Sequence, residues 1–170
     1  MLSKKMEKAI NDQIKWEYYS AYLYLSLSAY FMNLGLPGFA NWMDVQFQEE
    51  QFHARKMFDY VNSKGGRVML QPIEAPENTW KSPLDAFQFA LNHEYQVTKR
   101  INDLVTLAQK ENDHASAIFL QWFVTEQVEE EANFGDTVSK LKLVGDGGGL
   151  FLLDRELATR VYTAPAATAA

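Results

Sequence analysis

Cysteine is absent from the 170 residues of the chain. Its absence excludes disulfide bonds, zinc–thiolate sites, iron–sulfur clusters and thiol catalysis. Long apolar runs are also missing, because no stretch approaches the roughly 18 apolar residues of a membrane-spanning helix. The polar N-terminus lacks the apolar stretch of a signal peptide. We therefore expect a cytoplasmic protein with no membrane partner.

Basic residues are fewer than acidic residues. The chain has 16 Lys and Arg residues against 22 Asp and Glu residues, which gives a formal net charge of −6 at pH 7. This balance argues against a nucleic-acid partner, which normally requires a basic surface, and it is compatible with the binding of metal cations. Hydrophobic residues make up 47% of the chain, enough to fill the core of the single domain that its length indicates.

What the sequence does contain is a helical repeat of apolar residues. In four long segments, apolar positions recur about one helical turn apart, and glycine, proline and polar capping residues separate the segments. The four predicted helices cover residues 4–33, 37–63 or 64, 83–110 and 114–144. A shorter amphipathic helix is expected over residues 150–160, after the glycine-rich run 145–149, and the tail 161–170 is expected to be flexible.

The lengths of the connections predict the topology. The first and second helices, and likewise the third and fourth, are joined by a few residues, so each pair should be antiparallel. Residues 67–81 are different, because about fifteen extended residues reach about 50 Å at roughly 3.3 Å each. A helix of about 28 residues is about 42 Å long. The connection can therefore cross the full length of a four-helix bundle, with room for a few strand residues.

Acidic residues fall near the middle of all four predicted long helices: Glu17, Glu50, Glu94 and the run from Glu126 to Glu131. Glu50 and His53 are three residues apart, which places a carboxylate and an imidazole on one helical face. Because isolated ionised carboxylates are costly inside a bundle, such acids need a cation or protons. The layout matches the ligand pattern of di-iron four-helix bundles.

Each of these residues has an ordinary alternative when it is taken alone. A single helical Glu is usually solvated, and the run Glu129–Glu131 would usually form a solvated face. A structural helical bundle with surface acids and no metal turnover is therefore the alternative to a metal protein. His93 and His114 have no acidic partners at matching positions, and we predict that both lie on the surface.

Longer motifs accompany these acids: Asn11-Asp12-Gln13 with Glu17, Tyr19 to Leu25, Gly38 to Met43, Glu49-Glu50 with His53, Gly65 to Val68, Glu94, Phe119 to Phe123 and Glu126 to Glu131. Together they resemble the prokaryotic non-haem ferritins over residues 3–160. The resemblance implies an all-α, ferritin-like di-iron domain over these residues. It is a four-helix bundle with one long crossover and a short fifth C-terminal helix.

The resemblance also implies a pair of adjacent iron sites. The first is formed by Glu17, Glu50 and His53. The second is formed by Glu50, Glu94 and Glu130, with Gln127 close by and Glu50 bridging the two irons. A ligand set of carboxylates with one imidazole suits hard or borderline ions such as iron or manganese, and zinc could also bind.

A third, adjacent iron site is implied by four acids of the second and fourth helices: Glu49, Glu126, Glu129 and Glu130. Tyr24 resembles the tyrosine beside the centre that can supply an electron, and Trp122 is a second candidate for that role. For both aromatic residues, plain core packing is an equal alternative.

The implied function is iron storage. Fe(II) is oxidised to Fe(III) by dioxygen or hydrogen peroxide at the ferroxidase centre, and ferric oxide mineral is kept inside an octahedral shell of 24 copies of the chain. The short fifth helix would line the four-fold channels of this shell. The glycine-rich run 145–149 departs from the family pattern and could loosen that helix. The sequence therefore does not decide the exact form of the assembly.

Related families differ at identifiable positions. A bacterioferritin would have a second Glu-x-x-His motif and a haem-ligating Met just after the bridging Glu, whereas this chain has Gln127-x-x-Glu130 and Gln51, so no haem is expected. A rubrerythrin requires cysteine ligands. A mini-ferritin builds its site between subunits and would not need Glu17, Glu94 and Glu130 within one bundle.

Overall fold

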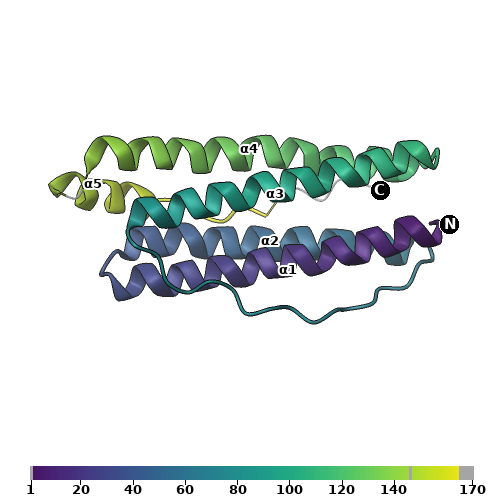
Figure 1. Cartoon of the computed structure of the whole chain (residues 1–170), viewed down its shortest axis with the longest axis horizontal. Coiled ribbons are helices and arrows are strands. Elements are labelled where there is room, and N and C mark those ends of the chain that lie inside the picture. The colour runs from purple at the N-terminus through teal and green to yellow at the C-terminus, as the bar shows by residue number, and fades with distance from the viewer. Residues whose placement is uncertain (1, 146, 165–170) are drawn as a thin grey trace.

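Four long helices and one short helix make up the computed structural model, which describes residues 2–145 and 147–164. The helices are α1 (Lys4–Asn33), α2 (Pro37–Ser63), α3 (Pro83–Lys110), α4 (His114–Val144) and α5 (Gly148–Leu157). Figure 1 shows α1 antiparallel to α2 and α3 antiparallel to α4, with the two pairs packed into one bundle. The predicted all-α bundle is confirmed, and the described residues contain no strand.

The predicted starts of α3 and α4 are confirmed, and each start is capped by a side chain. The Ser82 side chain accepts a hydrogen bond from the backbone N–H of Asp85 (3.1 Å), and the Asp85 carboxylate accepts one from the N–H of Lys81 (3.0 Å). The two side chains therefore form a reciprocal cap in the manner of a capping box. At the start of α4, Asp113 accepts from the N–H of Ser116. The preceding residue, Asn112, has φ 54°, a left-handed conformation that makes the tight turn between α3 and α4.

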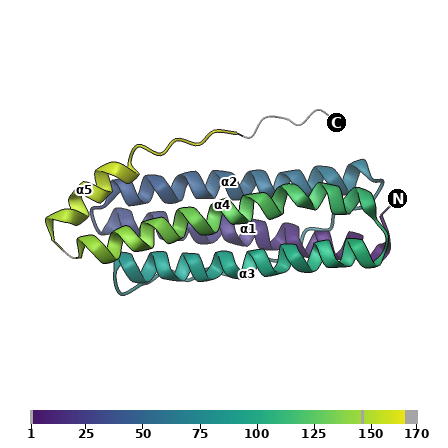
Figure 2. The same ribbon diagram turned by 90° about the horizontal axis from the view of Figure 1, so that it is seen from above.

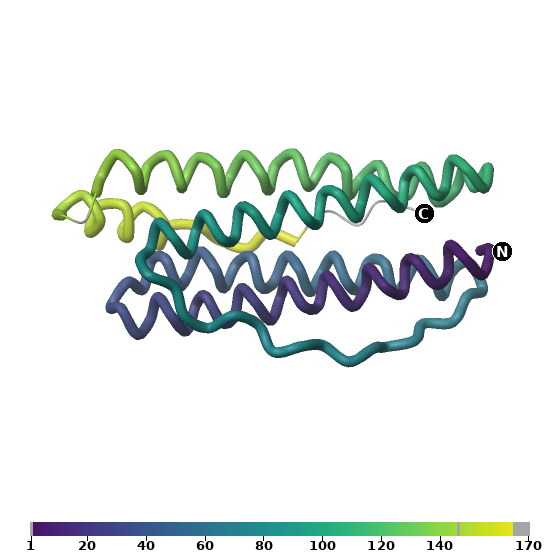
Figure 3. The backbone as a smooth tube through the Cα atoms, in the orientation of Figure 1, coloured from purple at the N-terminus to yellow at the C-terminus, as the bar shows by residue number. Residues whose placement is uncertain are grey.

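The long connection between α2 and α3 runs the length of the bundle, as Figure 3 shows. Hydrogen bonds from side chains of α1 hold this connection against the bundle. The Asn11 side chain donates a hydrogen bond to the carbonyl of Arg67 (3.0 Å), Ser26 donates to the carbonyl of Glu77 (2.7 Å), and Tyr30 donates to the carbonyl of Trp80 (3.1 Å). As a result α3 starts at the same end as α2 and runs parallel to it.

The apolar core consists of two clusters, one toward each end of the bundle. The first contains Tyr24, Phe31, Phe39, Phe87 and Phe134, and the second contains Met6, Ile10, Met57, Ile101 and Phe123. Burying one such side chain stabilises a fold by about 1.5–3 kcal/mol. In each long helix the buried positions between the two clusters are largely polar. The clusters therefore hold a layer of polar side chains at the middle of the bundle.

Helix α5 is fastened to the start of α2. The Asp154 carboxylate accepts hydrogen bonds from the backbone N–H groups of Gly38 (2.8 Å) and Phe39 (3.1 Å), which is a favourable position for a carboxylate at a helix N-terminus. A Cβ atom on Gly38 would lie 1.7 Å from the Asp154 carbonyl oxygen, so the close approach requires glycine.

The helix spans Gly148–Leu157 rather than the predicted 150–160, because residues 158–160 turn back toward α2. The predicted flexibility of the tail concerns residues that lie largely outside those described. None of the helices within residues 2–145 and 147–164 combines the length and the hydrophobicity needed to cross a membrane.

Candidate metal centre

The polar layer at the middle of the bundle contains one buried carboxylate from each long helix. Glu17 of α1, Glu50 of α2, Glu94 of α3 and Glu130 of α4 have at most 5% of their surface exposed. The surface placement required by the structural-bundle alternative is therefore wrong for these four acids. Burying four carboxylates together is unfavourable unless protons or cations accompany them.

Glu17, Glu50 and His53 form a compact group, in which one ligand atom from each residue lies within 4.8 Å of the others. The His53 Nδ1 atom is 3.5 Å from Oε2 of Glu50 and 3.9 Å from Oε2 of Glu17. Gln13 holds the other oxygen of Glu17 through a 2.8 Å hydrogen bond. Within the described part of the chain, Oε2 of Glu17 and Oε2 of Glu50 are buried with no hydrogen-bond partner. Two such oxygens beside an imidazole nitrogen suit a cation.

The other half of the layer is held by hydrogen bonds. The Tyr24 hydroxyl donates to Oε1 of Glu94, and the Gln127 amide donates to Oε2 of Glu94 (3.0 Å). The Gln46 amide donates to Oε2 of Glu130 (2.8 Å). Among the residues described, only Glu17, Glu50 and His53 form a group of three potential metal-ligand atoms close enough to share one ion. Glu94 and Glu130 therefore make hydrogen bonds with amide groups in the metal-free chain rather than forming a second such group.

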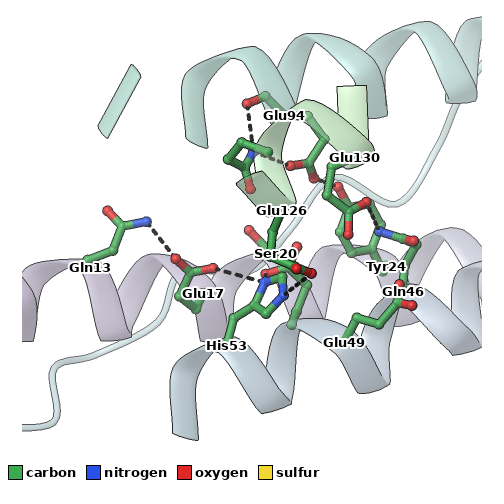
Figure 4. Close-up of polar contacts among 12 residues, drawn as sticks. Gln13, Glu17, Ser20, Tyr24, Gln46, Glu49, His53, Glu94, Glu126 and Glu130 are labelled. Atoms are coloured by element: carbon green, nitrogen blue, oxygen red, sulfur yellow. Dashed lines mark hydrogen bonds and ion pairs between the residues drawn. The ribbon is translucent and has the colours of Figure 1, made fainter. Parts of the chain in front are cut away.

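Figure 4 shows side chains from all four long helices converging on this layer. Burial raises the pKa of Glu50 well above its usual value, and the charges of Glu17 and Glu94 raise it further. Burial likewise raises the pKa of Glu130 well above its usual value and that of Glu94 to about 7. The layer therefore retains protons near neutral pH, and a bound cation would release them.

His53 is neutral in this environment, because burial lowers its pKa to about 4. Its short contacts with Glu17 and Glu50 are therefore not ion pairs in the metal-free chain. A neutral imidazole has a free lone pair, which is the form that binds a metal. The second ring nitrogen, Nε2, lies 3.9 Å from Oε2 of Glu126, so the ring stands between the buried layer and the acids outside it.

A cavity of about 380 Å³ lies on the outer side of His53. Three of the acids predicted for the third site line it: Glu49, Glu126 and Glu129. Glu49 is half-buried and forms a 2.7 Å ion pair with Arg160, whereas Glu129 is exposed. The fourth predicted acid, Glu130, is buried and faces Gln46. The predicted residues thus share a region but do not form a closed cluster within the described residues.

The prediction that His93 lies on the surface is wrong. The side chain is 7% exposed, and its Nε2 atom is 2.8 Å from the Ser20 hydroxyl. Its ring packs edge-on against Tyr24, with 6.3 Å between ring centroids. Position 93 continues the apolar repeat of Ala86, Ala90 and Val97, so the periodicity contained the signal. His114 is exposed, as predicted.

Two glutamines also belong to the site although sequence reasoning gave them no role. Gln13 stands four residues before Glu17, and Gln46 stands four residues before Glu50. That spacing places each amide one turn from a buried acid on the same face, which is a signal the sequence carries. Gln13 contacts the acid of its own helix, whereas Gln46 reaches across to Glu130 of α4.

The two aromatic candidates for electron transfer both contact the layer. Tyr24 is fully buried, stacks on Phe134 with 5.6 Å between centroids, and binds Glu94. The Trp122 ring lies edge-on to His53 at 5.4 Å. Packing and redox roles both remain compatible with these positions.

The fold and the site together define a four-helix bundle with a buried centre of carboxylates and one imidazole. Residues 7–144 match the ferritin-like domain family. A bacterial non-haem ferritin of Bacteroides fragilis (strain 638R) is 44% identical over 160 residues, which cover 94% of this chain and 100% of the relative. The bacterial non-haem ferritin of Staphylococcus haemolyticus (strain JCSC1435) is 40% identical over 163 residues, covering 95% and 98%.

Solved structures agree with these relatives. The open-pore ferritin of the archaeon Archaeoglobus fulgidus is 54% identical, with a TM-score of 0.94 over 95% of this chain and 100% of that one. A closed form engineered from that ferritin by site-directed mutagenesis is also 54% identical, with a TM-score of 0.95 over 96% and 100%. The chain belongs to the ferritin family. Its predicted resemblance to the prokaryotic non-haem ferritins is confirmed.

Proposed function

We propose that the chain is an iron-storage subunit that oxidises Fe(II) to Fe(III) and retains the ferric product as an oxide mineral inside a protein shell. The observation that carries this proposal is the buried layer in which unpartnered oxygens of Glu17 and Glu50 face the neutral imidazole of His53. Iron is the substrate of this centre, and membership of the ferritin family supports that choice.

In the proposed centre, Glu17, Glu50 and His53 hold the first Fe(II). Glu50 also contacts a second Fe(II), which Glu94 and Glu130 bind. Binding displaces the protons that burial keeps on these carboxyl groups. A ligand set rich in carboxylate oxygen favours Fe(III) over Fe(II), so it supports oxidation, with dioxygen or hydrogen peroxide accepting the electrons.

Gln127 and Tyr24 position Glu94 in this proposal, and Tyr24 is the candidate electron donor. Glu49, Glu126, Glu129 and Glu130 are proposed to hold a third iron in and beside the outer cavity, next to His53. No haem is expected to bind, because Gln51 stands where a haem-binding relative would have Met.

We further propose that the chain assembles into an octahedral shell of 24 copies. Large apolar side chains remain exposed on α4 and α5, including Ile118 (75%), Val128 (69%), Phe151 (64%) and Leu152 (68%). In this proposal, contacts between subunits bury these side chains. Because one relative is described as an open-pore ferritin, the closure of the shell is a separate question from its formation.

Aerobic iron loading tests the proposal. Fe(II) is added to the purified protein in excess over the three sites, and the product is separated by size-exclusion chromatography with iron analysis of each fraction. We expect hundreds of Fe(III) ions or more to elute with a large particle. Iron that precipitates as it does in a protein-free control would contradict iron storage.

A further inference from the structure

The segment after α5, residues 158–164, turns back along α2 (Figure 2). We call it the C-terminal strap. Arg160 fixes it to α2 by three contacts. Its carbonyl accepts a hydrogen bond from the Asn41 amide (3.0 Å), its guanidinium lies 4.2 Å from the ring centroid of Trp42, and its Nη2 atom donates to Oε2 of Glu49 (2.7 Å).

The strap carries Arg160 to the acidic cavity outside His53. Residues lining that cavity include Glu49, Glu126 and Glu129, and Val161 and Thr163 of the strap. Among the described lining residues, Arg160 is the one Lys or Arg. Its guanidinium therefore occupies Oε2 of Glu49 and partly balances three carboxylates.

The Arg160–Glu49 pair is suited to exchange. Arg–carboxylate pairs are frequently bidentate, with two parallel hydrogen bonds, but only Nη2 of Arg160 contacts Glu49. The Nη1 atom is buried with no hydrogen-bond partner among the described residues. The two side chains are 20% and 24% exposed, so water can replace part of what the pair loses. A divalent cation brings two charges to the same oxygen and can compete with such a contact.

We propose that Arg160 is a positioning residue that holds and neutralises Glu49 in the metal-free chain, and that it must leave Glu49 before a metal binds there. The C-terminal strap thereby sets the affinity of the outer site and becomes mobile when that site fills. This inference rests on the proposed third site of Glu49, Glu126, Glu129 and Glu130. The competing explanation is a purely structural clasp, in which Arg160 fastens the strap and leaves metal affinity unchanged.

Anaerobic titration of the full-length protein with Co(II), which is not oxidised under these conditions, separates the two explanations. Wild type is compared with Arg160→Gln, which removes the charge, and with Arg160→Lys, which keeps it. We expect Arg160→Gln to tighten the weakest of three binding events on the order of tenfold, as relief of one partly buried charge contact permits. Arg160→Lys should remain close to wild type, and the two stronger events should not change.

A double-variant comparison makes the result specific. Glu49→Gln should weaken the third event, and adding Arg160→Gln should then tighten it less than Arg160→Gln does in the wild-type background. A third event of equal affinity in wild type and Arg160→Gln would overturn the role of Arg160 while leaving the three sites intact. Three events that Glu49→Gln does not affect, or two events in every protein, would instead overturn the outer site of the proposed function, and the role of Arg160 with it.

Mobility of the strap gives an independent readout, which a change in binding affinity alone would not move. Because the chain has no cysteine, Val161→Cys provides a single position for a nitroxide spin label on an exposed strap residue. We expect the label to become more mobile when diamagnetic Zn(II) fills the sites, and to stay unchanged in a Glu49→Gln background. An identical spectrum with and without Zn(II) would contradict displacement of Arg160.

Discussion

The hydroxyl of Tyr24 on α1 donates a hydrogen bond to Glu94 on α3, across the middle of the bundle. The amide of Gln127 on α4 donates to the other oxygen of the same carboxylate. Side chains from two other helices thus fix the orientation of one acid of α3. Burial raises the pKa of Glu94 to about 7, and the hydrogen bonds from Tyr24 and Gln127 lower it, so these two neighbours favour the charged form of the acid.

Replacing Tyr24 by Phe removes the phenol without opening a large cavity. Losing this hydrogen bond should raise the pKa of Glu94 further and weaken Fe(II) binding at the second site. Outer contacts of this kind are worth about 10- to 100-fold in metal affinity. Anaerobic Fe(II) titration of Tyr24→Phe should show the second event weakened and the first unchanged. Tyr22→Phe, at a half-exposed position on the same helix, is the matched control. Equal loss in both variants would argue against a role for the phenol.

The buried carboxyls predict how pH acts on the metal-free protein. Glu94 has a pKa raised to about 7, and Glu50 and Glu130 are raised well above 4.5. A carboxyl group whose pKa is higher in the folded than in the unfolded state destabilises the fold as pH rises. The loss of stability occurs between the unfolded pKa and the folded pKa. His53 and His93, with pKa values lowered to about 4, have the opposite effect between about pH 4 and their unfolded pKa near 6.5.

Above about pH 6.5 the histidine contribution has ended and the carboxyl contribution continues. The Tm of the metal-free protein should therefore fall between pH 6.5 and 8. Anaerobic Co(II) should raise Tm more at pH 7.5 than at pH 6, because the metal replaces protons that the lower pH supplies. Differential scanning calorimetry at matched ionic strength measures both effects. A metal-induced rise in Tm that is larger at pH 6 would contradict the assignment of protons to this layer.

The contact between Asp154 and the start of α2 is expected to stabilise the docking of α5. Replacing it by Ala removes the carboxylate that caps the N–H groups of Gly38 and Phe39 and should destabilise the chain by about 1 kcal/mol, a typical cost for a lost N-cap. Asp154→Asn retains an accepting oxygen and is the matched control. If α5 is needed for subunit contacts, Asp154→Ala should also lower the fraction of assembled shells in size-exclusion chromatography. Intact shells at unchanged stability would show that α5 is held by other contacts.

Much of the fold could be predicted from the sequence, because its signals are local. Ser82 with Asp85, and Asp113 after Asn112, specify helix starts through contacts within four residues. The direction of the crossover followed from its length. The reach of the strap could not be predicted, since the contact between Arg160 and Glu49 joins residues 111 positions apart and depends on how α5 docks.

Burial of the acids in one layer was predictable, whereas the identity of their hydrogen-bond partners was less so. The sequence indicates Glu17, Glu50, His53, Glu94 and Glu130 because ionisable residues at core positions need an explanation. His93 was misplaced because histidine carries no strong preference for surface or core, and only its place in the apolar repeat indicated burial. Gln46 could not be assigned, because an amide at a buried position does not reveal which carboxylate it will meet across the bundle.

Oxidation kinetics of Glu50 and His53 variants show whether the buried layer is the ferroxidase centre. Fe(II) is mixed with dioxygen and the wild type, Glu50→Gln, His53→Ala, or the control Asp44→Asn, which changes an exposed acid of the same helix. Circular dichroism and chromatography establish that each variant folds and assembles. Loss of the initial rate by more than about a hundredfold is expected for Glu50→Gln and His53→Ala, because changes outside the ligand set alone cost metal centres about 10- to 100-fold. The control should keep the wild-type rate. Unchanged oxidation by folded Glu50→Gln and His53→Ala proteins would contradict the proposal that this buried layer is the ferroxidase centre.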